Sequence, residues 1–182
     1  MIRIFCPDEC LGSLLDVDLD ELWQKGYRGI ILDIDNTLLP WAGDTLDQDT
    51  ITWVKRAREM GFRLCLTSNA LKDRVERIAA ALDVPAVASA VKPRKKPFRQ
   101  ALRLLRAQPR ETVVIGDQMF TDILGGNRMA LYTILIDPVA TEELKATKMM
   151  RRIERRIIRR LSRKGYISES AARRRLAKSK DR

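Results

Sequence analysis

Residues 29–37 have the sequence Gly-Ile-Ile-Leu-Asp-Ile-Asp-Asn-Thr, in which a run of branched apolar side chains passes directly into carboxylates. A run of branched residues introduced by glycine is typical of a β-strand that is buried on both faces. We therefore expect a strand over residues 29–34. Asp33 and Asp35 would emerge where this strand ends.

Apolar runs of the same kind recur four more times along the chain. We expect further strands at residues 62–66, 86–88, 112–115 and 131–136. Between them, apolar residues recur at spacings of three and four, which predicts helices at about residues 47–60, 71–82, 97–107 and 121–128. Strands that alternate with helices imply right-handed crossovers and a mostly parallel sheet that is covered on both faces. The predicted fold class is therefore α/β with three layers.

Length and composition exclude several classes of protein and of catalytic site. Its 182 residues are the size of one domain, and its apolar runs are too short to cross a bilayer. Because charge and proline interrupt residues 1–9, we expect no secretory leader and a cytosolic protein. The lack of histidine excludes a Ser-His-Asp triad, a Cys-His pair and a histidine-ligated zinc. The cysteines Cys6, Cys10 and Cys65 are too few for a disulfide scaffold.

The net charge of +11 is concentrated at one end of the chain. Residues 145–182 hold 16 Lys and Arg against 3 Asp and Glu, whereas the residues before them hold 19 against 21. This break in composition divides the chain into three parts. We expect a near-neutral body over residues 1–140, a basic helix over residues 141–164 and a basic, flexible tail over residues 165–182.

Polar side chains that suit phosphate chemistry follow four of the predicted strands. They are Asp33, Asp35, Asn36 and Thr37, then Thr67, Ser68 and Asn69, then Lys92, then Gly116, Asp117 and Asp122. Because ligands of parallel sheets bind beyond the carboxyl ends of the strands, we expect these side chains to share one rim. Clustered carboxylates repel one another unless a cation compensates them, and oxygen ligands completed by a phosphate suit Mg²⁺. The sequence therefore predicts a magnesium-dependent phosphate site.

Each of these features also has a plain structural explanation when it is taken alone. Two aspartates after a strand commonly form a turn or a helix cap, and Ser68-Asn69 could equally cap the next helix. Lys92 could lie in a solvated basic loop, and Gly116-Asp117 in a tight turn. The order and the strand-end placement of all four together favour a site.

Four motifs carry a family resemblance. Asp33-Ile-Asp35-Asn36-Thr37, Leu66-Thr-Ser68-Asn69, Ala90-Val-Lys92-Pro93 and Gly116-Asp117-Gln-Met-Phe-Thr-Asp122 resemble the motifs of the haloacid dehalogenase-like (HAD) phosphohydrolase superfamily in order and spacing. The segments around the first and last motifs resemble the YqeG subfamily of class III HAD phosphatases, which is related to mitochondrial phosphatidylglycerophosphate phosphatases. The resemblance covers about residues 1–162 and implies a Rossmann-like HAD fold.

The resemblance implies a role for each carboxylate. Asp33 would be the nucleophile that forms an aspartyl-phosphate, and it would also ligate Mg²⁺. Asp35 would protonate the leaving alkoxide and then activate water, with its backbone carbonyl as a second metal contact. Asp117 would be a further metal ligand. Asp122 would ligate through water or orient Lys92.

The other motif residues would handle the phosphoryl group. The Ser68 hydroxyl and amide groups around Asn69 would donate hydrogen bonds to it, with Thr67 as a neighbouring donor. Lys92 would offset the charge of the phosphoryl oxygens and hold Asp33 ionised.

Two features of the motifs leave alternatives open. Lys95 and Lys96 compete with Lys92 for the role of the functional lysine, although the Lys92-Pro93 pair favours Lys92. Asn36 stands where many HAD enzymes have glycine, but asparagine tolerates the same left-handed geometry.

The distances between the motifs leave no room for a cap domain. The site would then be open unless a partner subunit covers it, or its substrate would be bulky, such as a macromolecule or a lipid at a surface.

The arginine-rich segment at about residues 150–163 is predicted to be a basic amphipathic helix. Ile153, Ile157 and Leu161 form an apolar stripe at helical spacing, and arginines occupy the remaining surface. We favour an anionic membrane surface as its partner, with the stripe in the acyl boundary and the arginines on lipid phosphates. In one alternative the stripe packs on the body, and in another the arginines bind RNA through phosphate contacts.

The leading interpretation is a Mg²⁺-dependent phosphomonoesterase that works through Asp33 and Asp35 on a lipid-borne substrate. By resemblance, the favoured substrate is phosphatidylglycerophosphate, which would give phosphatidylglycerol. The protein would be cytoplasmic and peripheral on the inner face of the membrane. The alternatives are a ribosome- or RNA-associated protein that keeps the fold as a scaffold, and a phosphatase of another substrate. The sequence leaves oligomerisation open.

Overall fold

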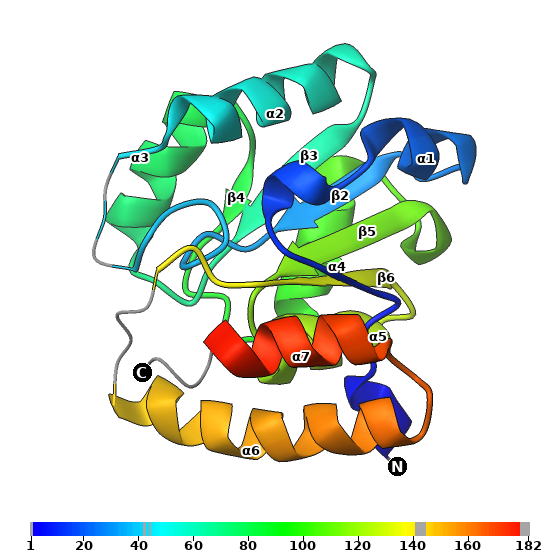
Figure 1. Ribbon diagram of the computed structural model, residues 1–182. Coiled ribbons are helices and arrows are strands. Elements are labelled where there is room, and N and C mark those ends of the chain that lie inside the picture. The colour runs from blue at the N-terminus through cyan, green and yellow to red at the C-terminus, as the bar shows by residue number, and fades with distance from the viewer. Residues whose placement is uncertain (1, 42, 44, 141–144, 179–182) are drawn as a thin grey trace.

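The chain forms a single parallel sheet of six strands (Figure 1). The computed structural model describes residues 2–41, 43, 45–140 and 145–178. The strands are β1 (Glu9–Leu11), β2 (Gly29–Leu32), β3 (Arg63–Thr67), β4 (Ala86–Val87), β5 (Thr112–Gly116) and β6 (Tyr132–Ile136). They lie in the order β1-β6-β5-β2-β3-β4, and every neighbouring pair is parallel. The prediction of an α/β fold with a mostly parallel sheet is confirmed.

Both faces of the sheet are buried, because successive side chains of a strand point to opposite faces. Ile30, Leu64 and Val113 belong to one apolar core, and Ile31, Cys65 and Val114 belong to another. The first face is covered by α1 (Leu19–Gln24), α2 (Gln48–Glu59) and α3 (Lys72–Leu82). The second is covered by α4 (Lys95–Leu105), α5 (Leu124–Asn127), α6 (Lys145–Arg163) and α7 (Glu169–Lys178). The predicted three layers are confirmed.

The helices expected in the body form with small shifts at their ends. Asp47 begins α2, because its carboxylate accepts a hydrogen bond from the Thr50 N–H at 2.6 Å. The helix expected over residues 121–128 starts earlier, as a π-helical turn at Met119–Ile123 that continues into α5. The connection from β2 to α2 contains no helix or strand among its described residues. The described residues of this connection therefore hold no inserted domain.

The N-terminal segment adds elements for which we had no expectation. The three residues of β1 pair with β6, and the Asp8 carboxylate accepts hydrogen bonds from the Thr133 N–H at 2.8 Å and hydroxyl at 3.0 Å. The short helix α1 begins at Asp18, whose carboxylate accepts a hydrogen bond from the Glu21 N–H at 2.9 Å. A strand of three residues is too short for a periodic signal, but the cap of α1 is visible in the sequence.

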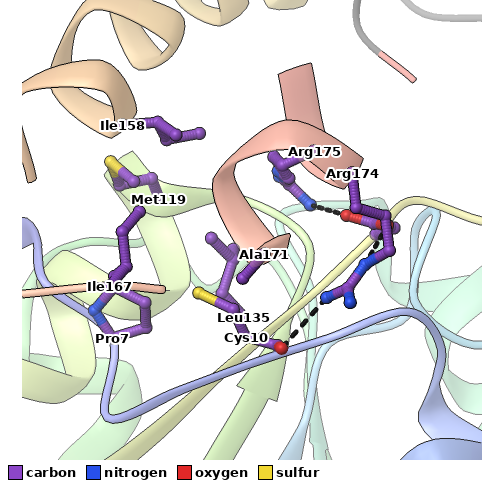
Figure 2. Close-up of a pocket in the computed structure, with 10 residues that line it drawn as sticks. Pro7, Cys10, Met119, Leu135, Ile158, Ile167, Ala171, Arg174 and Arg175 are labelled. Atoms are coloured by element: carbon purple, nitrogen blue, oxygen red, sulfur yellow. Dashed lines mark hydrogen bonds and ion pairs between the residues drawn. The ribbon is translucent and has the colours of Figure 1, made fainter. Parts of the chain in front are cut away.

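The basic helix is part of the body over the residues described (Figure 2). Ile158 and Leu161 of α6 and Ala172 of α7 share an apolar cluster with Met119 and Leu135. The gap left beside this cluster is about 10 Å³, about the space of one water molecule. The alternative in which the apolar stripe packs on the body is therefore the one that the structure supports.

Two expectations about the C-terminal segment need correction. The buried face of α6 is centred on Glu154, Ile158 and Leu161, whereas Ile153 of the predicted stripe is 40% exposed. The segment over residues 165–182 was expected to be flexible, but α7 forms within it and contributes buried side chains. Residues 141–144 and 179–182 of the two predicted segments lie outside the described residues. None of the described helices is long and apolar enough to span a bilayer.

Candidate active site

Three carboxylates meet at the carboxyl edge of the sheet. Asp33 follows β2, Asp117 follows β5 and Asp122 lies in the π-helical turn beyond it. One oxygen from each carboxylate lies within 4.8 Å of one from each of the others. All three residues are buried. The parallel register of β2 and β5, which pairs Leu32 with Ile115, brings the two strand ends together.

Lys92 neutralises part of this negative charge. Its ammonium donates hydrogen bonds to Asp33 Oδ1 at 2.5 Å, to Asp122 Oδ1 at 2.7 Å and to the Thr67 carbonyl at 3.0 Å. The side chain is only 1% exposed, whereas Lys95 and Lys96 are exposed at the start of α4. The structure thus brings Lys92, rather than either competing lysine, into the cluster.

The pKa values in the cluster reflect burial and mutual charge. Burial raises the pKa of the Asp33 carboxyl well above its ordinary value, and Asp122 and Asp117 raise it further, whereas Lys92 opposes the rise. Burial alone would lower the pKa of Lys92, but Asp122 and Asp33 outweigh it, and that pKa lies above its ordinary value. Lys92 therefore stays protonated. Lys92 acts in the expected direction on Asp33, because it lowers the pKa of that carboxyl, but desolvation is the larger effect.

Gly116 allows Asp122 to approach the strand end. A Cβ atom at Gly116 would lie 2.4 Å from the Asp122 carboxylate. Asp122 Oδ2 also accepts a hydrogen bond from the Gln118 N–H at 3.1 Å. This turn fixes the carboxylate between the Gln118 N–H and the Lys92 ammonium.

Asp35 lies outside the three-carboxylate cluster and has partners of its own. Its Oδ2 accepts a hydrogen bond from the Ser68 hydroxyl at 2.9 Å, and its Oδ1 accepts one from Arg74 of α3. Arg74 also donates to the carbonyls of Trp41 at 3.2 Å and Gly43 at 2.8 Å. We did not anticipate Arg74, because it stands inside a helix and outside every motif. It fixes Asp35 relative to the loop that follows it.

The backbone turn at Asn36 has the expected geometry. Asn36 has a φ of 61°, and its N–H donates to the Leu39 carbonyl at 2.8 Å. Asparagine therefore serves at this left-handed position where a related chain could use glycine. The turn places Asp35 beyond the end of β2, away from the core.

The three residues expected to bind phosphate differ in their hydrogen-bond partners. Ser68 donates to Asp35 and accepts from the Ala70 N–H at 2.9 Å. Asn69 Oδ1 accepts from the Lys92 N–H at 2.8 Å, so Asn69 holds the lysine backbone in place. The Thr67 hydroxyl is buried and has no hydrogen-bond partner among the described residues. In this arrangement the Ser68 hydroxyl contacts Asp35, and Asn69 positions Lys92.

Arg175 of α7 links the C-terminal helices to the site. Its guanidinium donates to the backbone carbonyls of Asp117 and Ile136. It also bonds Glu154 Oε1 of α6 through Nε at 3.1 Å and Nη2 at 2.7 Å, and its Nη1 lies 3.6 Å from Asp137 Oδ1. Figure 2 shows this side chain next to Arg174 on α7. We did not expect Arg175 to be buried, since one arginine in a basic tail carries no distinguishing signal.

The donor set fits a hard divalent cation. The cluster holds three carboxylates against one ammonium, all buried, so it carries an excess of negative charge that water does not screen. Carboxylate oxygens are the ligands that Mg²⁺ prefers. Asp33, Asp117 and Asp122 are thus the residues that could hold such an ion, and the Asp35 carboxylate is not among them.

Comparison with known proteins places this geometry in context. A family model described as a hydrolase, haloacid dehalogenase-like hydrolase, matches residues 40–129. The chain is 37% identical over 165 residues to the probable phosphatase YqeG of Bacillus subtilis (strain 168), covering 91% of this chain and 96% of that protein. It is 28% identical over 175 residues to phosphatidylglycerophosphate phosphatase 1, chloroplastic/mitochondrial, of Arabidopsis thaliana. That match covers 87% of this chain and 49% of the plant protein, so the chain spans about half of its length.

Solved structures share the fold at low sequence identity. A predicted HAD-like family hydrolase from Porphyromonas gingivalis superposes with a TM-score of 0.52 at 14% identity, covering 69% of this chain and 98% of that one. An uncharacterized protein from Listeria monocytogenes serotype 4b gives 0.52 at 20% identity, covering 64% and 84%. These likenesses show the common architecture alone.

Removing Arg175 tests whether the C-terminal helices support the site. Arg175→Ala leaves Glu154 and Asp137 buried without this guanidinium, so we expect a loss of about 3–5 kcal/mol in the free energy of unfolding. The matched control is Arg173→Ala, because Arg173 pairs with Glu169 at the surface of the same helix. That variant should change the value by less than about 1 kcal/mol. Urea denaturation measures both, and equal losses would contradict the assignment.

Proposed function

The chain belongs to the haloacid dehalogenase-like hydrolase family and is a phosphatase, and we propose from this premise that it hydrolyses a phosphomonoester through an aspartyl-phosphate on Asp33. The placement of Asp33 supports the proposal. Its Oδ1 contacts Lys92, and its Oδ2 accepts a hydrogen bond from the Thr37 hydroxyl at 3.2 Å. The carboxylate is held at the end of a rigid strand, which suits a nucleophile that must attack from a fixed direction.

The proposed first step is attack by Asp33 on phosphorus. One carboxylate oxygen forms a bond to phosphorus, and the bond to the ester oxygen breaks. Asp35 gives a proton to the departing alkoxide, and Lys92 offsets charge on the phosphoryl oxygens. In the second step water attacks the aspartyl-phosphate, Asp35 takes a proton from that water, and inorganic phosphate and free Asp33 are released. Ser68 and Thr67 would donate hydrogen bonds to the phosphoryl oxygens, for which the Ser68 hydroxyl turns from its contact with Asp35.

We propose Mg²⁺ as the cofactor of this reaction. Asp33, Asp117 and Asp122 would hold it, with the backbone carbonyl of Asp35 as a further oxygen donor. When bound, the ion supplies positive charge that stabilises negative charge developing on the phosphoryl group. It would also lower the raised pKa of Asp33 and so favour the nucleophilic carboxylate.

The proposed substrate is phosphatidylglycerophosphate, and the proposed place of action is the membrane surface on the cytoplasmic side. Two observations support this substrate class. The relative from Arabidopsis thaliana is named for that activity, and no cap domain encloses the described site, which leaves room for a substrate embedded in a bilayer. An RNA- or ribosome-associated function remains the competing hypothesis, supported only by the exposed arginines of α6.

Replacing the nucleophile tests the reaction. Asp33→Asn should abolish the release of phosphate from p-nitrophenyl phosphate, because an amide cannot attack phosphorus, while the circular dichroism spectrum is unchanged. Asp83→Asn is the matched control. Asp83 is an exposed carboxylate at the C-terminal end of α3, and it pairs with Arg58 of α2. Wild-type turnover in the Asp33 variant would remove this residue from the mechanism.

Adding Mg²⁺ to the metal-free protein tests the cofactor without measuring activity. Binding to the folded state alone should raise the free energy of unfolding by about 2.7 kcal/mol at one hundred times the dissociation constant. Asp117→Asn should weaken this stabilisation strongly, because it removes one of three carboxylates, whereas Asp20→Asn at the surface should leave it unchanged. Thermal unfolding with and without the ion gives the answer. A magnesium response that survives Asp117→Asn would count against this ligand set.

A substrate comparison tests the lipid. We expect the ratio kcat/KM to be highest for phosphatidylglycerophosphate in mixed micelles when it is measured beside a panel of soluble phosphate esters. The water-soluble headgroup, glycerol phosphate linked to glycerol, is the informative control, because it keeps the reacting group and lacks the acyl chains. Equal kcat/KM values for the headgroup and the intact lipid would argue against a lipid-surface enzyme.

A further inference from the structure

Four loops at the carboxyl edge of the sheet each carry one exposed, large apolar side chain. Nine such side chains are exposed in the described residues, and the other five are scattered over separate elements. The four are Trp41 after β2 (45% exposed), Leu71 after β3 (80%), Val91 after β4 (54%) and Val139 after β6 (52%). We call these four residues the apolar rim. It lies at the same edge of the sheet as the acidic cluster.

Backbone contacts tie the apolar rim to the site. Arg74, which binds Asp35, also donates to the Trp41 carbonyl at 3.2 Å. The Val139 N–H donates to the Asn36 carbonyl at 2.9 Å. The loops after β2 and β6 therefore lie side by side, at the left of Figure 1. Two members of the apolar rim therefore lie next to the turn that carries Asp35.

Two members of the apolar rim occupy positions that disfavour their side chains. Leu71 is the N-cap of α3 and makes no capping hydrogen bond, although Ser, Thr, Asp or Asn is strongly preferred there. Val91 has a φ of 52°, a left-handed geometry that is an outlier for a β-branched residue. Neither is compensated by burial, since both are more than half exposed. Local rules broken without a packing gain are expected where a surface serves a function.

Cations stand beside the apolar rim. Arg94 is the N-cap of α4, and Lys95 and Lys96 lie in its first turn, where no acidic residue is present. Cations at this end oppose the helix dipole, so they too reduce local stability. A cavity of about 260 Å³ at this junction is lined by Val91, Arg94 and Lys96, among others. Apolar side chains next to clustered cations complement the acyl chains and phosphates of an anionic lipid surface.

We propose that the apolar rim, together with Arg94, Lys95 and Lys96, docks the mouth of the site onto an anionic phospholipid bilayer. The inference deepens the proposed function and rests on its lipid-borne substrate. Trp41 lies at the level of the headgroups, where tryptophan is enriched, and Leu71, Val91 and Val139 enter the acyl boundary. The three cations contact lipid phosphates. This surface replaces the arginine-rich helix as the membrane contact, because the apolar face of α6 is packed on the body.

Vesicle binding by matched variants tests the docking surface. The double variant Leu71→Ser with Val91→Asn should bind mixed vesicles of phosphatidylcholine and phosphatidylglycerol about tenfold more weakly than the wild-type chain. Its melting temperature should stay level or rise, because serine caps helices and asparagine tolerates left-handed geometry. Lys95→Glu with Lys96→Glu should weaken binding similarly, and added salt should reduce the difference. Cosedimentation measures the binding.

Two control variants decide between surfaces. Leu104→Ser removes an apolar side chain that is 46% exposed near the C-terminal end of α4, at the other edge of the sheet from the apolar rim, and should leave binding unchanged. The second control replaces Arg156, Arg159 and Arg160 of α6 by serine. If this control loses vesicle binding while the Leu71 and Val91 variant keeps it, the proposal is wrong. Failure of the wild-type chain to bind vesicles, with or without binding to a duplex RNA, also overturns it.

The test separates this inference from the proposed function. Hydrolysis of p-nitrophenyl phosphate by the wild-type chain, dependent on Asp33, reports the chemistry in the absence of any bilayer. If that activity is present and the apolar rim variants bind vesicles as the wild type does, the docking surface fails and the phosphatase stands. If binding depends on the apolar rim but no phosphomonoester is hydrolysed, the proposed function fails and the surface stands.

Discussion

The ion pairs of the Lys92 ammonium with Asp33 and Asp122 are the interaction on which the site depends. Burying three carboxylates at one edge of a sheet would be strongly unfavourable without a counter-charge at short range. The lysine comes from the loop after β4, and the two carboxylates come from the segments after β2 and β5. The ion pairs therefore join three loops that are far apart in the sequence. The parallel register of β2, β3, β4 and β5 brings these connections to one edge of the sheet. The strand order that forms the sheet therefore also places the charged side chains of the site.

The C-terminal helices belong to this constraint as well. Arg175 holds the backbone of Asp117 from behind, and Glu154 and Asp137 balance its charge inside the protein. One arginine of the basic segment, Arg175, is therefore buried and structural, whereas others face solvent. Its large positive charge suggested a helix and tail that do not pack on the body, but a net charge does not reveal which of many arginines is buried. The packing of Ile158 and Leu161 decides that question.

The strands and helices of the body could be predicted because each has a complete signal of its own: branched runs such as residues 29–32, or apolar spacing bounded by Asp47 and Gly61. The motif order also pointed to the correct strand ends. What could not be predicted depends on distant partners. Arg74 and Arg175 look like ordinary helical arginines until the fold places them against Asp35 and Asp117, and β1 is a strand only because β6 pairs with it.

The central claim is that Asp33 carries the phosphoryl group during turnover. Asp35→Asn removes the base of the second step, while labelled p-nitrophenyl phosphate, whose leaving group departs without a proton from Asp35, keeps the first step running. Supplying this ester with Mg²⁺ and quenching in acid should trap that intermediate. Peptide mass spectrometry should then place a phosphoryl group on Asp33, and on no peptide when Asp33 is also replaced by asparagine. Release of labelled phosphate by the Asp35 variant with the Asp33 peptide unmodified throughout, or modification of a different residue, would contradict the account.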